Sequence, residues 1–409
     1  MFFKTLFADR KVGFTIIVAA LGYFVDVFDL GLFSAVRTNS LKSLGLQGDE
    51  LLNAGVFLLN WQNAGLLLGG ILWGILGDKK GRLSVLLGSI FLYSIANIAN
   101  AYVTSVEEYA AWRFIAGIGL AGELGAGITL ASELLPRQYR GYGTTLIASF
   151  GVLGGVASGF VGHYMQWNHA FLLGGVMGLA LLALRIGLTE STMFQKMDPT
   201  VVKGAFLRAL AKPHILKRLF LLILVGAPVW LCVGLFITFA PELGTAMGLA
   251  APPSAAIAYI CASAAIACGD LLSGLYSQHL QSRKKVARTF IIAFALAIMV
   301  YAFIGSASTV VFYGCYVLMG LACGYWTIFA QMGAENFGTN IRSTLATSIP
   351  NFVRATIIPV TLLFQFIKLH SSVLESALIV SALVIALALW ALSKLPETFH
   401  QDLEYVEKL

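Results

Sequence analysis

Ionisable side chains inside apolar stretches are the residues of this sequence whose types and positions could do chemistry. A charge within a lipid bilayer costs about 3 kcal/mol on insertion scales, so such residues are typical of ion pairs, proton relays and ligand sites. Five lie within long apolar segments: Asp26, Asp29, Arg113, Glu123 and Arg354. We expect these residues to handle protons or a charged ligand.

The three acids of this set differ in what they can do. Asp26 and Asp29 are three residues apart, so a helix presents both on one face. Counted from Lys11, Asp26 lies about 22 Å along a helix, past the middle of a bilayer core of about 30 Å. Glu123 lies about 15 Å before Glu133 and so near the midplane. We weigh three roles for Glu123: a proton carrier, a permanently protonated hydrogen-bonding group and a ligand of a cationic substrate.

Arg354 indicates the class of ligand. It lies twelve residues, or about 18 Å, beyond Arg342, close to the bilayer centre. Its guanidinium keeps its charge and suits a carboxylate or phosphate, so we expect Arg354 to bind an organic anion. Asn351 lies three residues earlier on the same helix face, and the alternative for Arg354 is an ion pair with Glu123. Three aromatic residues are expected to line the same cavity or to pack in its walls: Trp230, Tyr325 and Trp326.

The elements that hold these residues are predicted to be membrane-spanning helices. The 409 residues are 58% hydrophobic and 11% charged, with a mean hydropathy of +0.83, which excludes an ordinary soluble protein. Continuous rather than alternating apolarity predicts an all-α integral membrane fold. A spanning helix needs about 20 residues. Twelve segments qualify: 12–36, 53–77, 83–103, 109–132, 141–163, 168–188, 219–240, 253–277, 286–306, 309–333, 343–367 and 372–393.

The distribution of basic residues predicts the orientation. With the N-terminus in the cytoplasm, all but five of the 27 Lys and Arg residues fall on the cytoplasmic side. We therefore expect a multi-pass protein of the cytoplasmic (inner) membrane with both termini cytoplasmic. The net charge of +7 then reflects topology and contact with anionic lipids, and no nucleic-acid partner is expected. No cleavable signal peptide is predicted, and the five cysteines are expected to be packing residues and not metal ligands.

Internal repetition predicts two related halves. The segment GILGDKKGRL joins helices 2 and 3, and about 200 residues later GLYSQHLQSRKK joins helices 8 and 9. After helices 4 and 10, an acid precedes an arginine by seven residues in both halves. We expect two six-helix bundles, 1–189 and 219–409, joined by a cytoplasmic linker at 190–218 and related by a pseudo-two-fold axis along the membrane normal.

At these motifs the sequence resembles the major facilitator superfamily. The loop Gly74-x-x-x-Asp78-Lys-x-Gly81-Arg82 and the stretch RFIAGIGLAGELGAGITLASELLPRQYRG carry the resemblance, which covers essentially the whole chain. It is strongest to the metabolite–proton symporter and sugar porter-like branches, although TESTMF replaces the sugar porters' element after helix 6. The resemblance implies alternating access by a monomer. In proton-coupled sugar porters, an aspartate of helix 1 pairs with an arginine of helix 4. In this sequence Asp29 and Arg113 have the corresponding positions.

The same motifs predict a cytoplasmic gate. Charged residues at the inner helix ends form a latch in one conformation and separate in the other, and we expect Arg82 to pair with carboxylates such as Glu133 or with exposed carbonyls. The alternative is a simple interfacial anchor. The predicted gate residues are Gly74, Asp78, Gly81, Arg82, Glu133, Arg140, Glu335 and Arg342.

These features favour a secondary transporter that imports a small hydrophilic metabolite, more consistent with an organic anion than a sugar. Asp26, Asp29, Arg113 and Glu123 are predicted to couple protons, with no cofactor. A proton-coupled exporter and a facilitative sugar-type uniporter are the alternatives, although the lack of proline between Gly141 and His163 disfavours an exporter. We find no nucleophile or phosphate-loop motif that would indicate an enzyme, and no soluble output domain that would indicate a sensor.

Overall fold

The computed structural model describes residues 10–123, 125–127, 140–186, 210–337 and 339–399. Most of the predicted linker at 190–218 and all of the loop around Glu133 lie outside these ranges. Ten described helices are long and apolar enough to cross a membrane. Two predicted spans have no such helix: 109–132 runs into the undescribed stretch 128–139, and 141–163 begins just after it.

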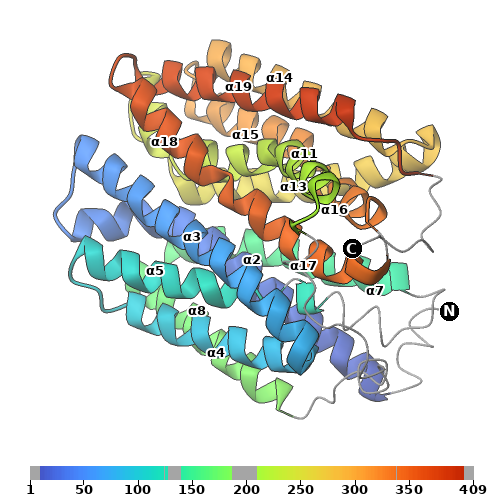
Figure 1. The fold of residues 1–409 in the computed structure, drawn as a ribbon. Helices are drawn as coiled ribbons and strands as arrows, with labels where there is room; N and C mark the ends of the chain where they lie inside the picture. Colours follow the sequence, from blue (N-terminus) through green and yellow to red (C-terminus); the bar gives the residue numbers. More distant parts are fainter. Residues whose placement is uncertain (1–9, 124, 128–139, 187–209, 338, 400–409) are drawn as a thin grey trace.

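Residues 10–186, here the N-terminal half, form one layer of helices (Figure 1). Helices α2 and α3 are unusually long, at 34 and 33 residues. The described helices of this half are α2 (Arg10–Ser43), α3 (Gly48–Lys80), α4 (Arg82–Asn100), α5 (Val106–Leu120), α7 (Arg140–Tyr164) and α8 (Trp167–Arg185).

Residues 210–399, here the C-terminal half, form the second layer, and several of their helices are interrupted (Figure 1). A π-helix, η2, follows α11, and short irregular stretches divide α15 from α16 and α17 from α18. The elements are α11 (Pro213–Leu231), η2 (Cys232–Ile237), α12 (Ala240–Ala246), α13 (Ala255–Leu280), α14 (Arg283–Ile304), α15 (Thr309–Cys323), α16 (Trp326–Glu335), α17 (Thr339–Ala355), α18 (Ile357–Lys368) and α19 (Val373–Lys394).

Local sequence explains where many helices begin. The serine before the helix accepts a hydrogen bond from a backbone N–H of the first turn, which satisfies a donor that the helix itself leaves open. At α19 this becomes a capping box, because Glu375 also bonds back to Ser372. Among the helices that the structure describes, five begin with such a serine cap: Ser105, Ser254, Ser282, Ser308 and Ser372. Between α3 and α4, Gly81 has a φ of +96°, which only glycine adopts easily.

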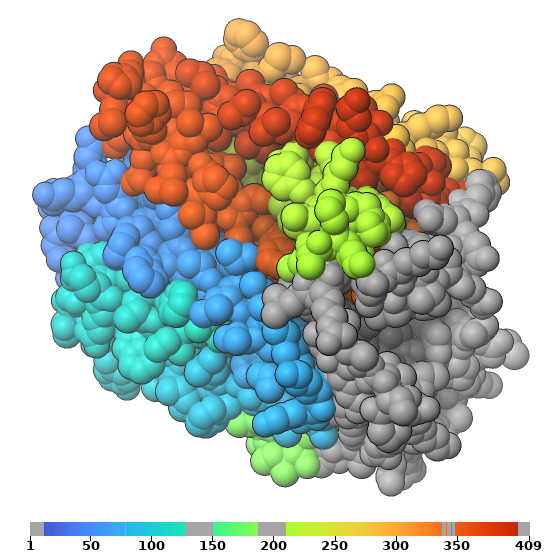
Figure 2. All heavy atoms as spheres, in the orientation of Figure 1, coloured from blue at the N-terminus to red at the C-terminus, as the bar shows by residue number. Residues whose placement is uncertain are grey.

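Glycines of α7 bring the two halves into close contact. A Cβ atom at Gly154 would lie 2.1 Å from the carbonyl oxygen of Phe24 on α2. On the other side of α7, a Cβ at Gly159 would lie 2.9 Å from the carbonyl oxygen of Ala256 on α13. Small residues therefore let α7 pack against backbone of both halves. On the face shown in Figure 2, side chains of α17 and α18 also meet those of α3.

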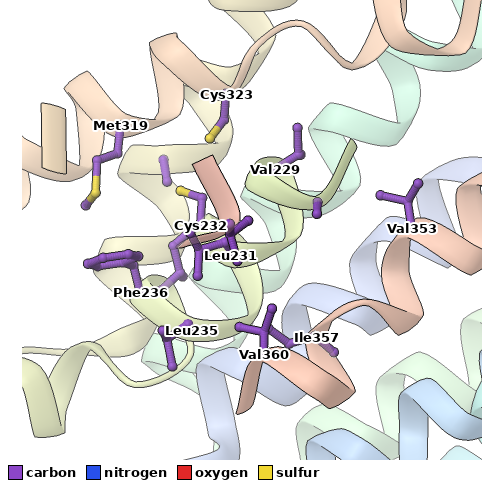
Figure 3. Close-up of a cluster of buried hydrophobic side chains, with 14 of the residues drawn as sticks. Val229, Leu231, Cys232, Leu235, Phe236, Met319, Cys323, Val353, Ile357 and Val360 are labelled. Atoms are coloured by element: carbon purple, nitrogen blue, oxygen red, sulfur yellow. The ribbon is translucent and has the colours of Figure 1, made fainter. Parts of the chain in front are cut away.

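The core of the C-terminal half surrounds the π-helix. Its side chains come from η2 and from α11, α15, α17 and α18, which are distant in sequence (Figure 3). All are buried, so the interrupted helices pack through a continuous apolar cluster. The labelled members are Val229, Leu231, Cys232, Leu235, Phe236, Met319, Cys323, Val353, Ile357 and Val360.

Candidate substrate and proton site

Asp29 and Arg113 form a buried ion pair inside the N-terminal half. Arg113 Nη2 lies 3.3 Å from Asp29 Oδ2, and both side chains are fully buried. Asn97 completes a closed triangle, because its Nδ2 donates to Asp29 Oδ1 at 2.5 Å and its Oδ1 accepts from Arg113 Nη1 at 3.3 Å. The rings of Phe33 and Phe171 lie 5.1 and 5.4 Å from the guanidinium carbon. The pair suggested by the resemblance is therefore present in the structure, while its role in proton coupling stays a prediction.

Glu123 pairs with Arg185 and not with Arg354. Arg185 Nη1 and Nη2 donate to the two carboxylate oxygens at 2.9 and 2.7 Å, and Ser89 Oγ donates to Oε1 at 2.8 Å. This geometry corrects the alternative pairing of Arg354 with Glu123. Both oxygens of Glu123 are occupied, so a bidentate pair within the N-terminal half satisfies this buried carboxylate.

Arg185 was not among the residues that the sequence singled out. It lies at the end of α8, where an arginine is usually an interfacial residue, yet only 1% of it is exposed. Its Nη1 also donates to the carbonyl oxygen of Leu86 at 2.8 Å. A Cβ atom at Gly22 would lie only 2.0 Å from Arg185 Nη2, so the guanidinium lies directly against the backbone of α2.

Arg354 and Asp26 form the third buried pair, and this one joins the two halves. Arg354 Nη2 on α17 lies 3.2 Å from Asp26 Oδ2 on α2, with side-chain exposures of 3% and 0%. The ring of Trp230 lies 5.5 Å from the guanidinium carbon, within cation–π range. Among the described residues, Asp26 Oδ1 and Trp230 Nε1 are buried without a hydrogen-bond partner. This pair therefore keeps unused hydrogen-bonding capacity in the centre of the molecule.

The other predicted ligand residues lie in different surroundings. Asn351 is buried and bridges the halves, since its Nδ2 donates to the carbonyl oxygen of Ala121 at 2.9 Å. Trp326 is half-buried, and its ring lies 5.2 Å from that of Phe329. Tyr325 is fully buried, and its hydroxyl donates to the carbonyl oxygen of Val225 at 2.8 Å. Of the two roles predicted for Tyr325, its burial and this bond favour packing, because the hydroxyl holds α11 and the start of α16 together.

Asp270 is a further intramembrane acid that the sequence analysis overlooked. It lies within α13, and its Oδ1 accepts the backbone N–H of Thr327 at 3.0 Å. That N–H belongs to the first turn of α16, where a negative charge is favourable. A Cβ atom at Gly324, in the break before α16, would lie only 2.4 Å from the backbone of Gly269. Asp270 therefore caps the half-helix at a close backbone crossing, and an isolated acid in an apolar segment was the available signal.

At the end of the bundle where α2 ends and α3 begins, polar contacts connect the two halves. Arg37 on α2 donates to both carboxylate oxygens of Glu242 at 2.6 and 2.8 Å and to the carbonyl oxygen of Thr238 at 3.0 Å. Lys368 on α18 lies 2.5 Å from Asp49 at the start of α3. The orientation expected from the basic residues makes this the outer end, and here the halves are fastened together.

The predicted gate is only partly described. Glu133 lies outside the described residues, as do the side chains of Asp78, Arg140 and Arg342, so the expected Arg82–Glu133 pair stays a prediction. Gly74 is buried near the end of α3. Arg82 Nη1 donates to the carbonyl oxygen of Gly77 at 2.6 Å, across the Gly81 turn.

The second half has a similar arrangement at the start of α14. Arg283 Nη1 donates to Ser277 Oγ at 2.8 Å, much as Arg82 bonds across its own turn. Arg283 Nη2 also lies 3.3 Å from Glu335 Oε1, and Thr398 donates to the other carboxylate oxygen at 2.6 Å. Glu335 thus has a partner, Arg283, that the motif spacing did not indicate.

Two helical layers that meet around a central cross-half ion pair define a membrane carrier built from two halves. The sequence model of the Major Facilitator Superfamily matches residues 19–357, and the chain belongs to this superfamily. The fold is accordingly the predicted one of twelve spanning helices in two bundles, and the superfamily and its matched relatives are transporters and not enzymes.

Relatives of known name show what kinds of transporter the chain is similar to. It is 30% identical over 178 residues to the niacin transporter NiaP of Acinetobacter baylyi, which covers 42% of this chain and 40% of that protein. It is 33% identical over 135 residues to the 4-hydroxybenzoate transporter PcaK of Pseudomonas aeruginosa, covering 32% of this chain and 30% of that protein. The matched stretches thus span less than half the length of these two relatives.

The fold itself matches over nearly the full length. The inward-open structure of the xylose transporter XylE from E. coli superposes with a TM-score of 0.73, covering 95% of this chain and 97% of that one. The sequences are only 16% identical, so this likeness concerns the architecture.

Proposed function

We propose that this protein imports a small organic anion together with protons, and that the anion is an aromatic or heteroaromatic monocarboxylate. The observation that carries the proposal is Arg354: a buried arginine at the meeting of the two halves, held by a single acid and faced by an indole ring. Its planar fork suits a carboxylate, and the Trp230 ring suits an aromatic body.

The names of the relatives support this substrate class. Both niacin and 4-hydroxybenzoate consist of a carboxyl group on a six-membered aromatic ring, and both transporters are similar to this chain. A sugar would not need a buried arginine at this depth, where the charge costs free energy unless a partner compensates it. Protons are the proposed coupling ion because each buried arginine of the centre is paired with an acid that can accept one.

The proposal includes an inner-membrane carrier that works as a monomer, with both termini in the cytoplasm. Rocking of the two halves would expose the central pair to each side in turn. The contacts of Arg37 with Glu242 and of Lys368 with Asp49 would then form the outer closure, which has to open for the substrate to enter.

Uptake into proteoliposomes tests the proposal. The panel contains radiolabelled nicotinate, 4-hydroxybenzoate, nicotinamide and xylose, each measured with and without an inward proton gradient. We expect gradient-dependent accumulation of the two acids and not of the two neutral compounds. Arg354→Ala should abolish it, and Arg354→Lys should weaken it because the bidentate fork is lost.

Arg288→Lys is the matched control, since Arg288 is an exposed arginine on α14. It should transport like the wild type. Accumulation of only the neutral compounds, or full activity of Arg354→Ala, would refute an anion carrier built on Arg354.

A further inference from the structure

The three buried ion pairs differ in how completely the carboxylate is satisfied. Asp29 has both oxygens bonded, one by Asn97 and one by Arg113. Glu123 likewise has both oxygens bonded by Arg185. Asp26 is held through Oδ2 alone, and its Oδ1 has no hydrogen-bond partner among the described residues although the side chain is fully buried. Of these three acids, Asp26 is the one with a carboxylate oxygen that none of the described residues satisfies.

The pairs also differ in the elements that they connect. Asp29–Arg113 and Glu123–Arg185 lie within the N-terminal half, so movement of one half against the other leaves them intact. Asp26 and Arg354 come from α2 and α17, in different halves. Movement of one half against the other therefore changes the distance between Asp26 and Arg354. Whether this ion pair is formed thus depends on the conformation of the carrier.

Resting on the proposed function, we infer that Asp26 occupies the place of the substrate carboxylate in the empty carrier, and that one proton on Asp26 accompanies each monoanion. A proton adds to a carboxylate oxygen of Asp26, and the ion pair with Arg354 opens. The substrate carboxylate then pairs with the freed guanidinium. On the other side the substrate leaves, Asp26 releases its proton, and the pair with Arg354 forms again.

Charge balance at the centre provides the coupling. In the empty carrier, Arg354 and ionised Asp26 sum to zero. In the loaded carrier, Arg354, neutral Asp26 and the monoanion also sum to zero. With the proton alone or the anion alone, one charge in the closed interior is uncompensated, which is strongly unfavourable. Only the empty and the fully loaded forms can therefore close and cross, so neither ion leaks without the other.

The groups around Asp26 are compatible with this role. Glu123 and Asp29 are the nearby acids that act on it electrostatically, and each is already neutralised by its own arginine. The tyrosines facing it are neutral donors and carry no competing charge. They come from three helices: Tyr23 on α2, Tyr93 on α4 and Tyr259 on α13.

The decisive experiment separates exchange from accumulation, using radiolabelled nicotinate and 4-hydroxybenzoate as probes. In Asp26→Asn the internal competitor for Arg354 is permanently neutral. We expect exchange of internal unlabelled for external labelled probe to stay within about threefold of the wild type. Accumulation driven by the proton gradient should fall to the level seen without a gradient. Arg288→Lys, as before, should match the wild type in both assays.

A measurement on the wild type keeps the inference testable if the variant does not fold. One proton per monoanion moves no net charge, so uptake should respond to a pH gradient and not to a potassium–valinomycin potential. Uptake that follows the potential would overturn the inference, and so would gradient-driven accumulation in folded Asp26→Asn. Loss of exchange in folded Asp26→Asn would also overturn it. A wild-type protein that moves neither probe would instead overturn the proposed function itself.

Discussion

The two halves of this molecule bury polar groups in different ways. The N-terminal half contains complete ion pairs, Asp29–Arg113 and Glu123–Arg185, with side-chain exposures of 2% or less. In the C-terminal half, fully buried tyrosine hydroxyls donate to backbone carbonyls, Tyr316 to Phe236 and Tyr325 to Val225, each at 2.8 Å, and the acid Asp270 accepts a hydrogen bond from a backbone N–H. A buried charge demands a matched partner, whereas a hydroxyl needs only one acceptor.

The longest uninterrupted helices also belong to the N-terminal half. The charge-rich half contains α2 and α3, which run without interruption for 34 and 33 residues. The C-terminal half has a π-helix after Pro228, a break at Gly324 and another at Thr356. Such irregularities are where helices bend. The N-terminal half thus presents its acids and arginines largely from long helices, and the C-terminal half contains several of the irregularities at which helices bend.

The largest expected effect comes from breaking an ion pair of the N-terminal half. Arg185→Ala leaves Glu123 buried without its cation, and removing one partner of a buried pair costs about 3–5 kcal/mol. The melting temperature of the purified protein in detergent should fall markedly. Adding Glu123→Gln should restore part of the loss because the stranded charge is gone. A melting temperature equal to that of Arg288→Ala would contradict a structural role for the pair.

An intermediate effect is expected at a break of the C-terminal half. In Gly324→Ala the new methyl group would meet the backbone of Gly269, so α13 and the α15–α16 junction must separate. Overpacking of this kind costs about 1–3 kcal/mol. Gly314→Ala, at a position with open space on α15, is the matched control. Equal melting temperatures for the two variants would show that the crossing is looser than the structure indicates.

The smallest expected effect concerns a single hydroxyl. Tyr325→Phe removes the bond to the carbonyl oxygen of Val225 and leaves the ring in place, at a cost of about 1 kcal/mol. The melting temperature should fall slightly, while uptake of the acid probes stays close to that of the wild type. A large loss of uptake at unchanged stability would instead favour the other predicted role, in which Tyr325 lines the substrate cavity.

Much of the architecture follows from the sequence alone. Apolar segments of spanning length predicted twelve helices because a bilayer accepts only backbone that bonds to itself. The superfamily was recognisable from the loop at Gly74 and the motif after Arg113. The important buried charges were also visible, since Asp26, Asp29, Glu123 and Arg354 interrupt apolar runs.

Three members of the polar interior were missed from the sequence, and of these only Asp270 interrupts an apolar run in the same way. Arg185 resembled an interfacial residue because it ends its apolar segment, and Asn97 has no charge to mark it. Asp270 was a lone acid whose partner is the backbone of another helix. The partners of these three residues come from other helices, and a pairing set by helix packing leaves no pattern in the residue types.

The sequence therefore determined which residues carry charge into the membrane, because composition and hydropathy are local properties of the chain. Only the tertiary structure decided which acid faces which arginine. Asp26 and Asp29 share a helix and differ by three residues, yet one pairs across the halves with Arg354 and the other within its half with Arg113. That choice depends on how each helix is rotated and how the two halves pack, and these are set by contacts between residues far apart in sequence.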